Sequence, residues 1–149
     1  MTQLFTLTSI GEWSHVFDRM VPVLRPGMVL ALSGPLGAGK TTCTQELLTY
    51  LGGSVQAKSP TFALMRQYAV TRAPFTRLLH IDVYRLERAE DVQVLALEEE
   101  LSESGTLAVI EWPEQMADWM VRHAERCVWL TIAPKEGESR EVTLEYRTE

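Results

Sequence analysis

Apolar residues are arranged in two patterns along this chain, and each pattern predicts a different element. Continuous apolar runs of strand length cover residues 28–32, 78–83, 107–110 and 128–132. Runs without polar alternation are typical of strands that are covered on both faces of a sheet. Residues 61–68 are also consistent with a strand. These segments predict a sheet whose central strands are buried.

Apolar positions at helical spacing predict helices between these strands. The first helix begins after Ser9, which can cap it, and ends near Pro22 or by residues 25–27, which include a Pro-Gly pair. Three more helices are predicted over residues 41–51, 89–101 and 114–126. Strands that alternate with helices indicate an α/β domain of three layers around a largely parallel sheet.

The end of the chain departs from this alternation. Residues 128–132 and 142–146 are strand-like, and the polar turn 135–139 separates them. This spacing predicts a C-terminal antiparallel hairpin. No internal repeat, low-complexity tract or linker interrupts the 149 residues, so we expect a single domain over residues 1–149.

A phosphate-binding motif lies between the first predicted strand of the sheet and the helix after it. Gly34–Thr41 match G-x-x-x-x-G-K-[ST] at every required position. Glycines let backbone N–H groups surround a phosphate, and the helix N-terminus adds unpaired donors and a positive dipole end. The residues expected to bind the nucleotide here are Gly37, Ala38, Gly39, Lys40, Thr41 and Thr42.

Two side chains of this motif carry its chemistry. Lys40 should neutralise the β- and γ-phosphates of a nucleoside triphosphate, and the Thr41 hydroxyl should take one coordination position of Mg²⁺. Lys40 is the full positive charge that the loop itself supplies, and we expect its ammonium to be exposed. The motif therefore predicts a nucleotide site that works with magnesium.

A phosphate loop of this kind uses a second acid near the metal, usually at the end of a neighbouring strand. Glu111 fits better, because four apolar residues, 107–110, lead directly into it. Asp82 also fits, but it lies within an apolar run, where an unpaired carboxylate is costly, and it could instead pair with Arg85. His80 in the same run is more typical of a satisfied core histidine than of a proton carrier. Lys40, Glu111 and Asp82 are thus the candidate catalytic residues.

Charge and composition narrow the class of function. The net charge is −6 and the densest charged run, residues 98–100, is acidic, which disfavours tight binding of nucleic acid by this chain alone. No apolar run reaches the roughly 18 residues that span a bilayer, and the first residues do not resemble a signal peptide. We therefore expect a cytoplasmic protein with no membrane partner, in which Cys43 and Cys127 are free, buried thiols.

Four segments, in order along the chain, resemble the TsaE (YjeE) family, bacterial ATPases required for threonylcarbamoyladenosine modification of tRNA. Residues 32–42 are similar to the phosphate loop of the family, and residues 58–62 to its S-P-T-F segment. Residues 80–86 match its H-x-D-x-Y-R-L signature, and residues 110–114 match its E-W-P-E segment. The resemblance implies a P-loop NTPase fold, ATP as the nucleotide, TsaD and TsaB as partners, and tRNA contact only through that complex.

The resemblance also implies roles for individual residues. It puts Ser59, Thr61 and Asp82 on the γ-phosphate side of the nucleotide, where they would resemble a switch segment. It puts Thr8 or Ser9 beside the adenine. Glu111 would serve the metal together with Thr41 and would help to orient the attacking water.

Three classes of function are compatible with these motifs. The preferred one is an ATP-hydrolysing subunit of the tRNA-modifying assembly. A small P-loop kinase is the alternative, but kinases of that kind typically carry an arginine-rich lid or acceptor insertion, and residues 52–77 contain only Arg66, Arg72 and Arg77. A nucleotide-gated interaction module without turnover is disfavoured if Glu111 orients water.

Overall fold

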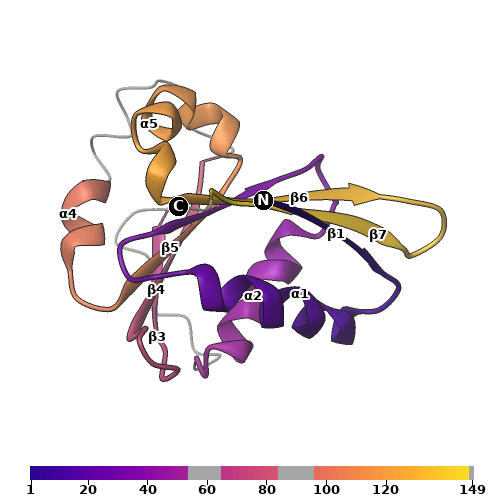
Figure 1. Cartoon of the computed structure of the whole chain (residues 1–149), viewed down its shortest axis with the longest axis horizontal. Coiled ribbons are helices and arrows are strands. Elements are labelled where there is room, and N and C mark those ends of the chain that lie inside the picture. Colours follow the sequence, from indigo (N-terminus) through magenta and orange to yellow (C-terminus); the bar gives the residue numbers. More distant parts are fainter. Residues whose placement is uncertain (54–64, 84–95, 148–149) are drawn as a thin grey trace.

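The computed structural model describes residues 1–53, 65–83 and 96–147, and Figure 1 shows how these parts are arranged. The described strands form one sheet in the order β1-β7-β6-β2-β5-β4-β3. Their bounds are Thr2–Leu7 (β1), Val29–Ser33 (β2), Met65–Ala69 (β3), Arg77–Asp82 (β4), Thr106–Glu111 (β5), Cys127–Pro134 (β6) and Arg140–Glu145 (β7).

The centre of this sheet is parallel and its borders are antiparallel. Strands β6, β2, β5 and β4 run in the same direction, whereas β7 and β1 on one side and β3 on the other run against their neighbours. Strands β6 and β7 form the predicted hairpin around residues 135–139. The α/β fold with a parallel sheet centre and a C-terminal hairpin is therefore confirmed.

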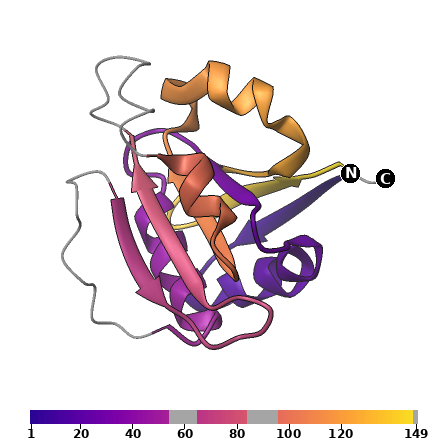
Figure 2. The ribbon, with the colours of Figure 1, turned by 90° about the vertical axis from the view of Figure 1, so that its left-hand side faces the viewer.

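Helices cover both faces of the sheet. The helices α1 (Trp13–Met20) and α2 (Lys40–Tyr50) lie on one face, and α4 (Leu97–Ser102) and α5 (Ala117–Arg122) lie on the other (Figures 1 and 2). Short 3-10 turns extend α1 and α5: η1 (Ile10–Glu12), η2 (Val21–Val23), η3 (Pro113–Met116) and η4 (Ala124–Arg126). The predicted three layers follow from this arrangement.

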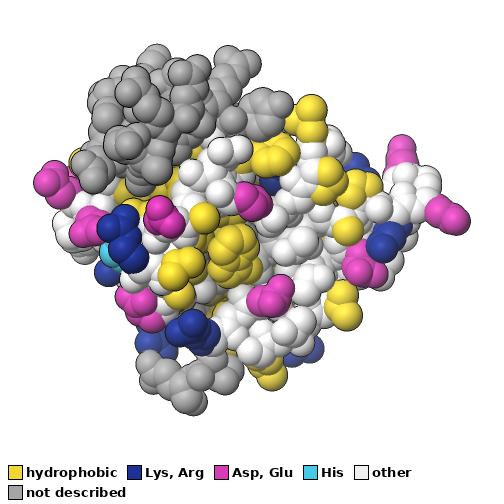
Figure 3. All heavy atoms as spheres, turned by 90° about the horizontal axis from the view of Figure 1, so that it is seen from above, with side chains coloured by type: hydrophobic (Ala, Val, Ile, Leu, Met, Phe, Trp, Pro, Cys, Tyr) yellow, Lys and Arg dark blue, Asp and Glu magenta, His cyan; other side chains and the backbone are white. Residues whose placement is uncertain are grey.

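The two faces of the sheet bury separate apolar clusters, because successive side chains of a strand point in opposite directions. Leu30 and Leu32 of β2 join the cluster under α1 and α2, whereas Val29 and Ala31 join the cluster under α4 and α5. Seen from the α5 side, the molecule shows an apolar patch with acidic side chains at its borders (Figure 3).

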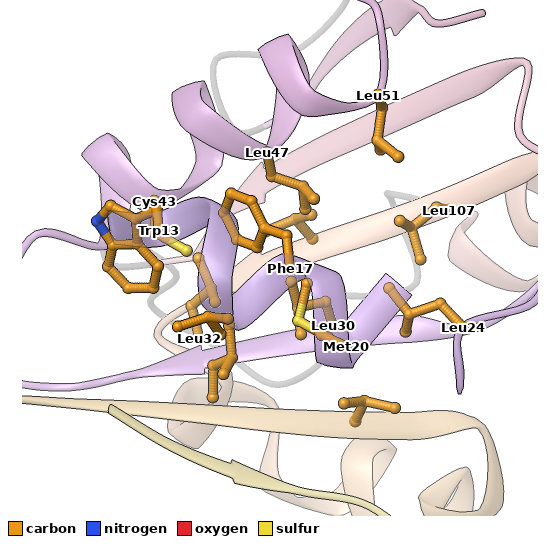
Figure 4. Close-up of a cluster of buried hydrophobic side chains, with 14 of the residues drawn as sticks. Trp13, Phe17, Met20, Leu24, Leu30, Leu32, Cys43, Leu47, Leu51 and Leu107 are labelled. Carbon is orange, nitrogen blue, oxygen red and sulfur yellow. The ribbon is translucent and has the colours of Figure 1, made fainter. Parts of the chain in front are cut away.

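The cluster under α1 and α2 holds the phosphate-binding end of α2 against the sheet. Figure 4 shows Phe17 of α1 and Leu47 of α2 directed toward each other above β2. Both side chains are fully buried or nearly so. Burying a side chain of this size contributes about 1.5–3 kcal/mol, so this contact helps to hold α2 against the sheet.

Several predicted elements differ from the observed ones at their ends. The predicted helix over residues 114–126 is divided into η3, α5 and η4, because Met116 and His123 leave the helical region at φ −121° and −120°. Of the helix predicted over 89–101, residues 89–95 lie outside the described residues; α4 begins at Leu97, after Ala96, which adopts a left-handed conformation at φ 49°. Strand β1 was not predicted, because Thr2–Leu7 buries only its last residue fully.

Two further expectations concern chemistry rather than topology. Cys43 and Cys127 are free and buried, as predicted. Burial raises the pKa of both thiols, that of Cys127 to about 11, so neither is a reactive thiolate at neutral pH. Within the described ranges, no helix is long and apolar enough to cross a membrane.

Candidate nucleotide-binding site

The glycine-rich loop connects the end of β2 to the start of α2 at the carboxyl edge of the parallel strands. Gly34, Gly37 and Gly39 all have positive φ, at 154°, 79° and 107°. A Cβ added to Gly34 would lie 2.5 Å from the carbonyl oxygen of Ile132, so the loop packs against β6 without room for a side chain. Gly39 caps α2 without a side-chain hydrogen bond, which leaves the first amide groups of this helix to a phosphate.

Lys40, the first residue of α2, turns its side chain back over the loop. Its Nζ donates hydrogen bonds to the carbonyl oxygens of Gly34 and, at 3.2 Å, Pro35, and lies 3.5 Å from the ring centroid of Trp112. The expectation of an exposed ammonium is wrong, since Lys40 is only 5% exposed. This burial lowers the pKa of Lys40, and the nearby carboxylates of Glu111, Glu114 and Asp82 oppose that shift. The ammonium therefore lies within a group of acids.

Glu111 ends β5 directly opposite the loop and is 3% exposed. The Thr41 hydroxyl donates to its Oε1 at 3.2 Å, with Oε2 at 3.5 Å. The Nε2 atom of His80 is hydrogen bonded to Oε2 of the same carboxylate. A side chain from β4 and one from the start of α2 thus both hydrogen bond to the Glu111 carboxylate at the end of β5.

Asp82 lies beside Glu111 at the same sheet edge, since the two residues are partners in the parallel pairing of β4 and β5. The expectation that Asp82 is enclosed within an apolar strand is wrong, because it is the last residue of β4 and is exposed. The suggested pairing with Arg85 lies outside the described residues. Both candidate acids are thus close to Lys40, and Glu111 alone of the two contacts Thr41 among the hydrogen bonds of the described residues.

The turn after Glu111 places the Trp112 ring over the Lys40 ammonium. Trp112 has φ 62°, a left-handed conformation that is rare for a residue with a side chain. Pro113 begins the 3-10 turn η3, and Glu114 accepts a hydrogen bond at 2.9 Å from the Ser33 hydroxyl at the end of β2. The turn is therefore tied to the strand that leads into the phosphate loop.

A cavity of about 270 Å³ lies on the other side of the loop, where α2 meets the N-terminal segment. Ser9, which the sequence placed near adenine, lines this cavity together with Gly39 and Thr42. Thr8 lines it as well, and its backbone N–H and hydroxyl both donate to Glu12. The predicted adenine-side residues and the phosphate loop are thus adjacent in space.

Arg140 also lines this cavity, and no motif of the sequence predicts it. Its Nε would be 3.3 Å from a Cβ added to Gly39, so its guanidinium lies against the loop. Arg140 is the first residue of β7, which the hairpin brings back to the loop from about a hundred residues away along the chain. No local motif marks such a residue, because its position depends on tertiary structure. Ser59 and Thr61, the predicted switch residues, lie outside the described part of the chain.

The donor set fits a magnesium nucleotide better than a metal held by protein alone. Thr41 and Glu111 offer oxygen donors, which Mg²⁺ prefers. Within the described ranges, no group of three or more His, Cys, Asp or Glu side chains could enclose a metal ion. Mg²⁺ is usually held by one or two protein oxygens together with phosphates and water, which agrees with this sparse set.

The family model described as "Threonylcarbamoyl adenosine biosynthesis protein TsaE" matches residues 7–142. The chain belongs to the TsaE family. The tRNA threonylcarbamoyladenosine biosynthesis protein TsaE of Rickettsia bellii is 37% identical over 109 residues, which are 72% of this chain and 72% of that protein. The TsaE protein of a Nostoc species is 42% identical over 98 residues, or 62% of this chain and 57% of that protein.

A solved structure supports the same fold. The crystal structure of Bacillus subtilus YdiB superposes with a TM-score of 0.71 and covers 97% of this chain and 84% of that one, at 24% sequence identity. The region that matches the TsaE model runs from the end of β1 into β7. It therefore includes the phosphate loop, both acids and Arg140, and the resemblance inferred from four short segments is confirmed.

Proposed function

We propose that this chain binds ATP with magnesium at Gly34–Thr41 and hydrolyses it, as the TsaE subunit of the machinery that installs threonylcarbamoyladenosine in tRNA. The observation that carries the proposal is the 3.2 Å hydrogen bond between Thr41 and Glu111. It joins the hydroxyl of the phosphate loop to the acid at the end of the neighbouring strand, the pair through which such loops hold magnesium. Family membership supplies the tRNA pathway.

Each side chain of the site has a task in this proposal. The amide groups of the loop and the first turn of α2 bind the phosphates, and Lys40 neutralises charge on the β- and γ-phosphates. Thr41 and Glu111 would hold magnesium, which when bound supplies further neutralisation of the phosphate charge. Glu111 also orients the attacking water, with Asp82, Ser59 and Thr61 on the γ-phosphate side.

The proposal extends to partners and location. We assign TsaD and TsaB as partners on the family resemblance, and tRNA as a substrate met only through that complex. The net charge of −6 supports an indirect contact with tRNA, because a domain that binds RNA by itself usually needs a basic surface. Since tRNA modification requires access to tRNA, we place the activity in the cytoplasm.

The kinase alternative finds no support among the described residues. Arg77 pairs with Glu100 at 2.8 Å and with Glu103 at 3.3 Å. The Arg72 guanidinium lies 4.3 Å from the centroid of the Tyr50 ring. Two of the three arginines that could have bound a phosphate acceptor are thus engaged in other contacts. Arg77 lies at the end of β4 opposite to Asp82.

The test replaces the loop lysine and measures nucleotide binding separately from folding. Lys40→Ala should abolish tight binding of a fluorescent ATP analogue and the release of phosphate, while circular dichroism shows a folded protein. Lys135→Ala is the matched control, because Lys135 is exposed in the turn between β6 and β7. Normal ATP hydrolysis by Lys40→Ala would contradict the proposal. Phosphate transfer from ATP to an added small acceptor, without free phosphate, would indicate a kinase instead.

A further inference from the structure

His80 lies on β4, two residues before Asp82 at the carboxyl edge of the sheet. It is the partner of Val109 in the parallel pairing of β4 and β5, and Asp82 is the partner of Glu111 two residues further along. Because side chains alternate along a strand, His80, Asp82, Val109 and Glu111 all point to the face that carries α2. The imidazole can therefore reach forward along the sheet to the Glu111 carboxylate.

A direct hydrogen bond joins the two side chains. Nε2 of His80 is hydrogen bonded to Oε2 of Glu111. In the tautomer that carries its proton on Nε2, the imidazole donates this bond and the carboxylate oxygen accepts it. The imidazole side chain is 11% exposed and that of Glu111 is 3% exposed, so water competes little for either group.

The other oxygen of the Glu111 carboxylate, Oε1, faces Thr41. Thr41 Oγ1 is closer to Oε1, at 3.2 Å, than to Oε2, at 3.5 Å. A hydroxyl can donate its proton to a carboxylate while its lone pairs face a metal ion. Thr41 and His80 are the side chains that hydrogen bond to Glu111 within the described part of the chain.

We propose that His80 is a positioning residue for magnesium-dependent hydrolysis: it holds Oε2 of Glu111 so that Oε1 stays directed toward Thr41, the residue with which Glu111 would hold the metal. This inference rests on the proposed function. His80 contacts the Glu111 carboxylate and acts through the rotamer of that side chain. Partners of this kind behind a metal-binding carboxylate change metal affinity or activity by about 10–100-fold when they are removed.

Three substitutions separate positioning from simple packing. His80→Leu keeps an apolar body but removes the donor. His80→Asn keeps an amide but is too short to place N–H where Nε2 lies. His80→Gln carries its amide N–H at about the reach of Nε2 and should restore the bond to Glu111.

A histidine–carboxylate pair elsewhere in the chain provides the matched control. His123 lies 3.0 Å from Glu98 through Nε2 and Oε1, and its side chain is 17% exposed, close to that of His80. This pair connects α4 to the end of α5, away from the phosphate loop. His123→Leu should therefore leave metal and nucleotide affinity unchanged.

The measurement is metal binding in the presence of ADP, followed by the electron paramagnetic resonance of Mn²⁺, with thermal unfolding of every variant. His80→Leu and His80→Asn should weaken Mn²⁺ binding by about 10–100-fold. ADP affinity without metal should stay as in the wild type, and His80→Gln should stay close to the wild type in both respects. In steady-state assays at saturating metal, kcat should fall in His80→Leu while KM for ATP changes little.

Several outcomes would overturn the inference. These are wild-type Mn²⁺ affinity in a folded His80→Leu, equal loss in His80→Gln and His80→Leu, or loss of metal-free ADP affinity to the same extent as Mn²⁺ affinity. Unfolding of both His80→Leu and His80→Asn would make the histidine a packing residue and would also overturn it. If the wild-type protein itself binds no nucleotide, the proposed function fails first. If the wild type binds Mn²⁺ with ADP and His80→Leu does so equally well, this inference alone fails.

Discussion

At the scale of single residues, the site is defined by charges that are partly removed from water. Lys40 lies under the Trp112 ring and against two loop carbonyls, and Glu111 lies between Thr41 and His80. Electrostatic interactions are stronger where water is excluded, so in the proposed function these groups would act on a phosphate more strongly than exposed side chains would. Because these charged side chains are buried, each would be destabilised by the loss of its hydrogen-bonding partner.

Glu111→Gln tests the assignment of the two acids. The amide keeps the shape of the side chain and removes its charge, so ATP affinity should remain largely intact while kcat falls by about 100-fold or more. The measurement is phosphate release at saturating ATP and magnesium, alongside binding of an ATP analogue. Asp82→Asn is the comparison, since Asp82 is exposed beside Glu111. An inactive Asp82→Asn with a normal Glu111→Gln would reverse the assignment.

Arg140→Ala tests whether the cavity beside the loop receives the base side of the nucleotide. Arg140 lines that cavity with Thr8 and Ser9, and its guanidinium lies against Gly39 of the loop. Affinity for ATP should therefore fall, whereas affinity for inorganic triphosphate, which has no base or sugar, should not change. Arg122→Ala, in the exposed last turn of α5, is the control. Equal loss for ATP and triphosphate would place the guanidinium on the phosphates instead.

At the scale of elements, the loop conformation depends on the strand beside it. Gly34 faces the carbonyl oxygen of Ile132 in β6, and its φ of 154° is unfavourable for a residue with a Cβ. The conformation of the phosphate loop is thus set partly by β6, which the chain reaches almost a hundred residues later. The turn after β5 has a similar dependence, because Glu114 is bonded to Ser33 at the end of β2.

Gly34→Ala should destabilise the fold by about 1–3 kcal/mol and weaken nucleotide binding, because backbone strain is added to the close approach to Ile132. Urea unfolding and binding of an ATP analogue measure the two effects. Gly11→Ala is the control, since a Cβ there would meet nothing within 4 Å. A Gly34→Ala protein with wild-type stability would mean that the loop can move away from β6 at little cost.

The elements that could be predicted from sequence are those whose signal is local. Central strands such as β2 and β5 are buried on both faces and are therefore continuously apolar, and the motif at Gly34–Thr41 carries its own chemistry. Strand β1 was not predicted because it lies at the sheet border, where Leu7 alone of its side chains is fully buried. The position of Arg140 beside the loop and the contact of His80 with Glu111 could not be predicted from local sequence, because each depends on a neighbour that is distant along the chain.

At the scale of the whole molecule, the nucleotide edge carries an apolar group at its tip. Leu36, in the loop itself, is 76% exposed, and Ile10 beside the neighbouring cavity is 59% exposed. Single exposed apolar side chains are common on protein surfaces, so these two by themselves do not define a docking surface. On the proposal that the chain works within a complex, Leu36 at the tip of the loop is the side chain that we test as a partner contact.

The partner dependence leads to a prediction about rate. We expect slow ATP turnover by the chain alone and stimulation by TsaD and TsaB, because phosphoryl transfer is accelerated by added positive charge near the γ-phosphate, about 10³–10⁵-fold for an arginine supplied in trans. Steady-state ATPase with and without the partners tests this for the wild type and for Thr61→Ala, the predicted switch substitution. Full activity alone, with no stimulation and no effect of Thr61→Ala, would remove both the partner dependence and the switch.

Leu36→Asp separates partner docking from nucleotide binding within that assay. A charge on the exposed tip of the loop should lower the ratio of stimulated to basal rate, because the partner would have to bury an unpaired carboxylate. Val121→Asp is the matched control: Val121 is 77% exposed on α5, on the opposite face of the sheet from α2. Binding of an ATP analogue to each variant, measured without partners, corrects for any direct effect on the loop. If Leu36→Asp and Val121→Asp are stimulated equally, the partner approaches by another surface, and the exposed leucine has no part in the complex.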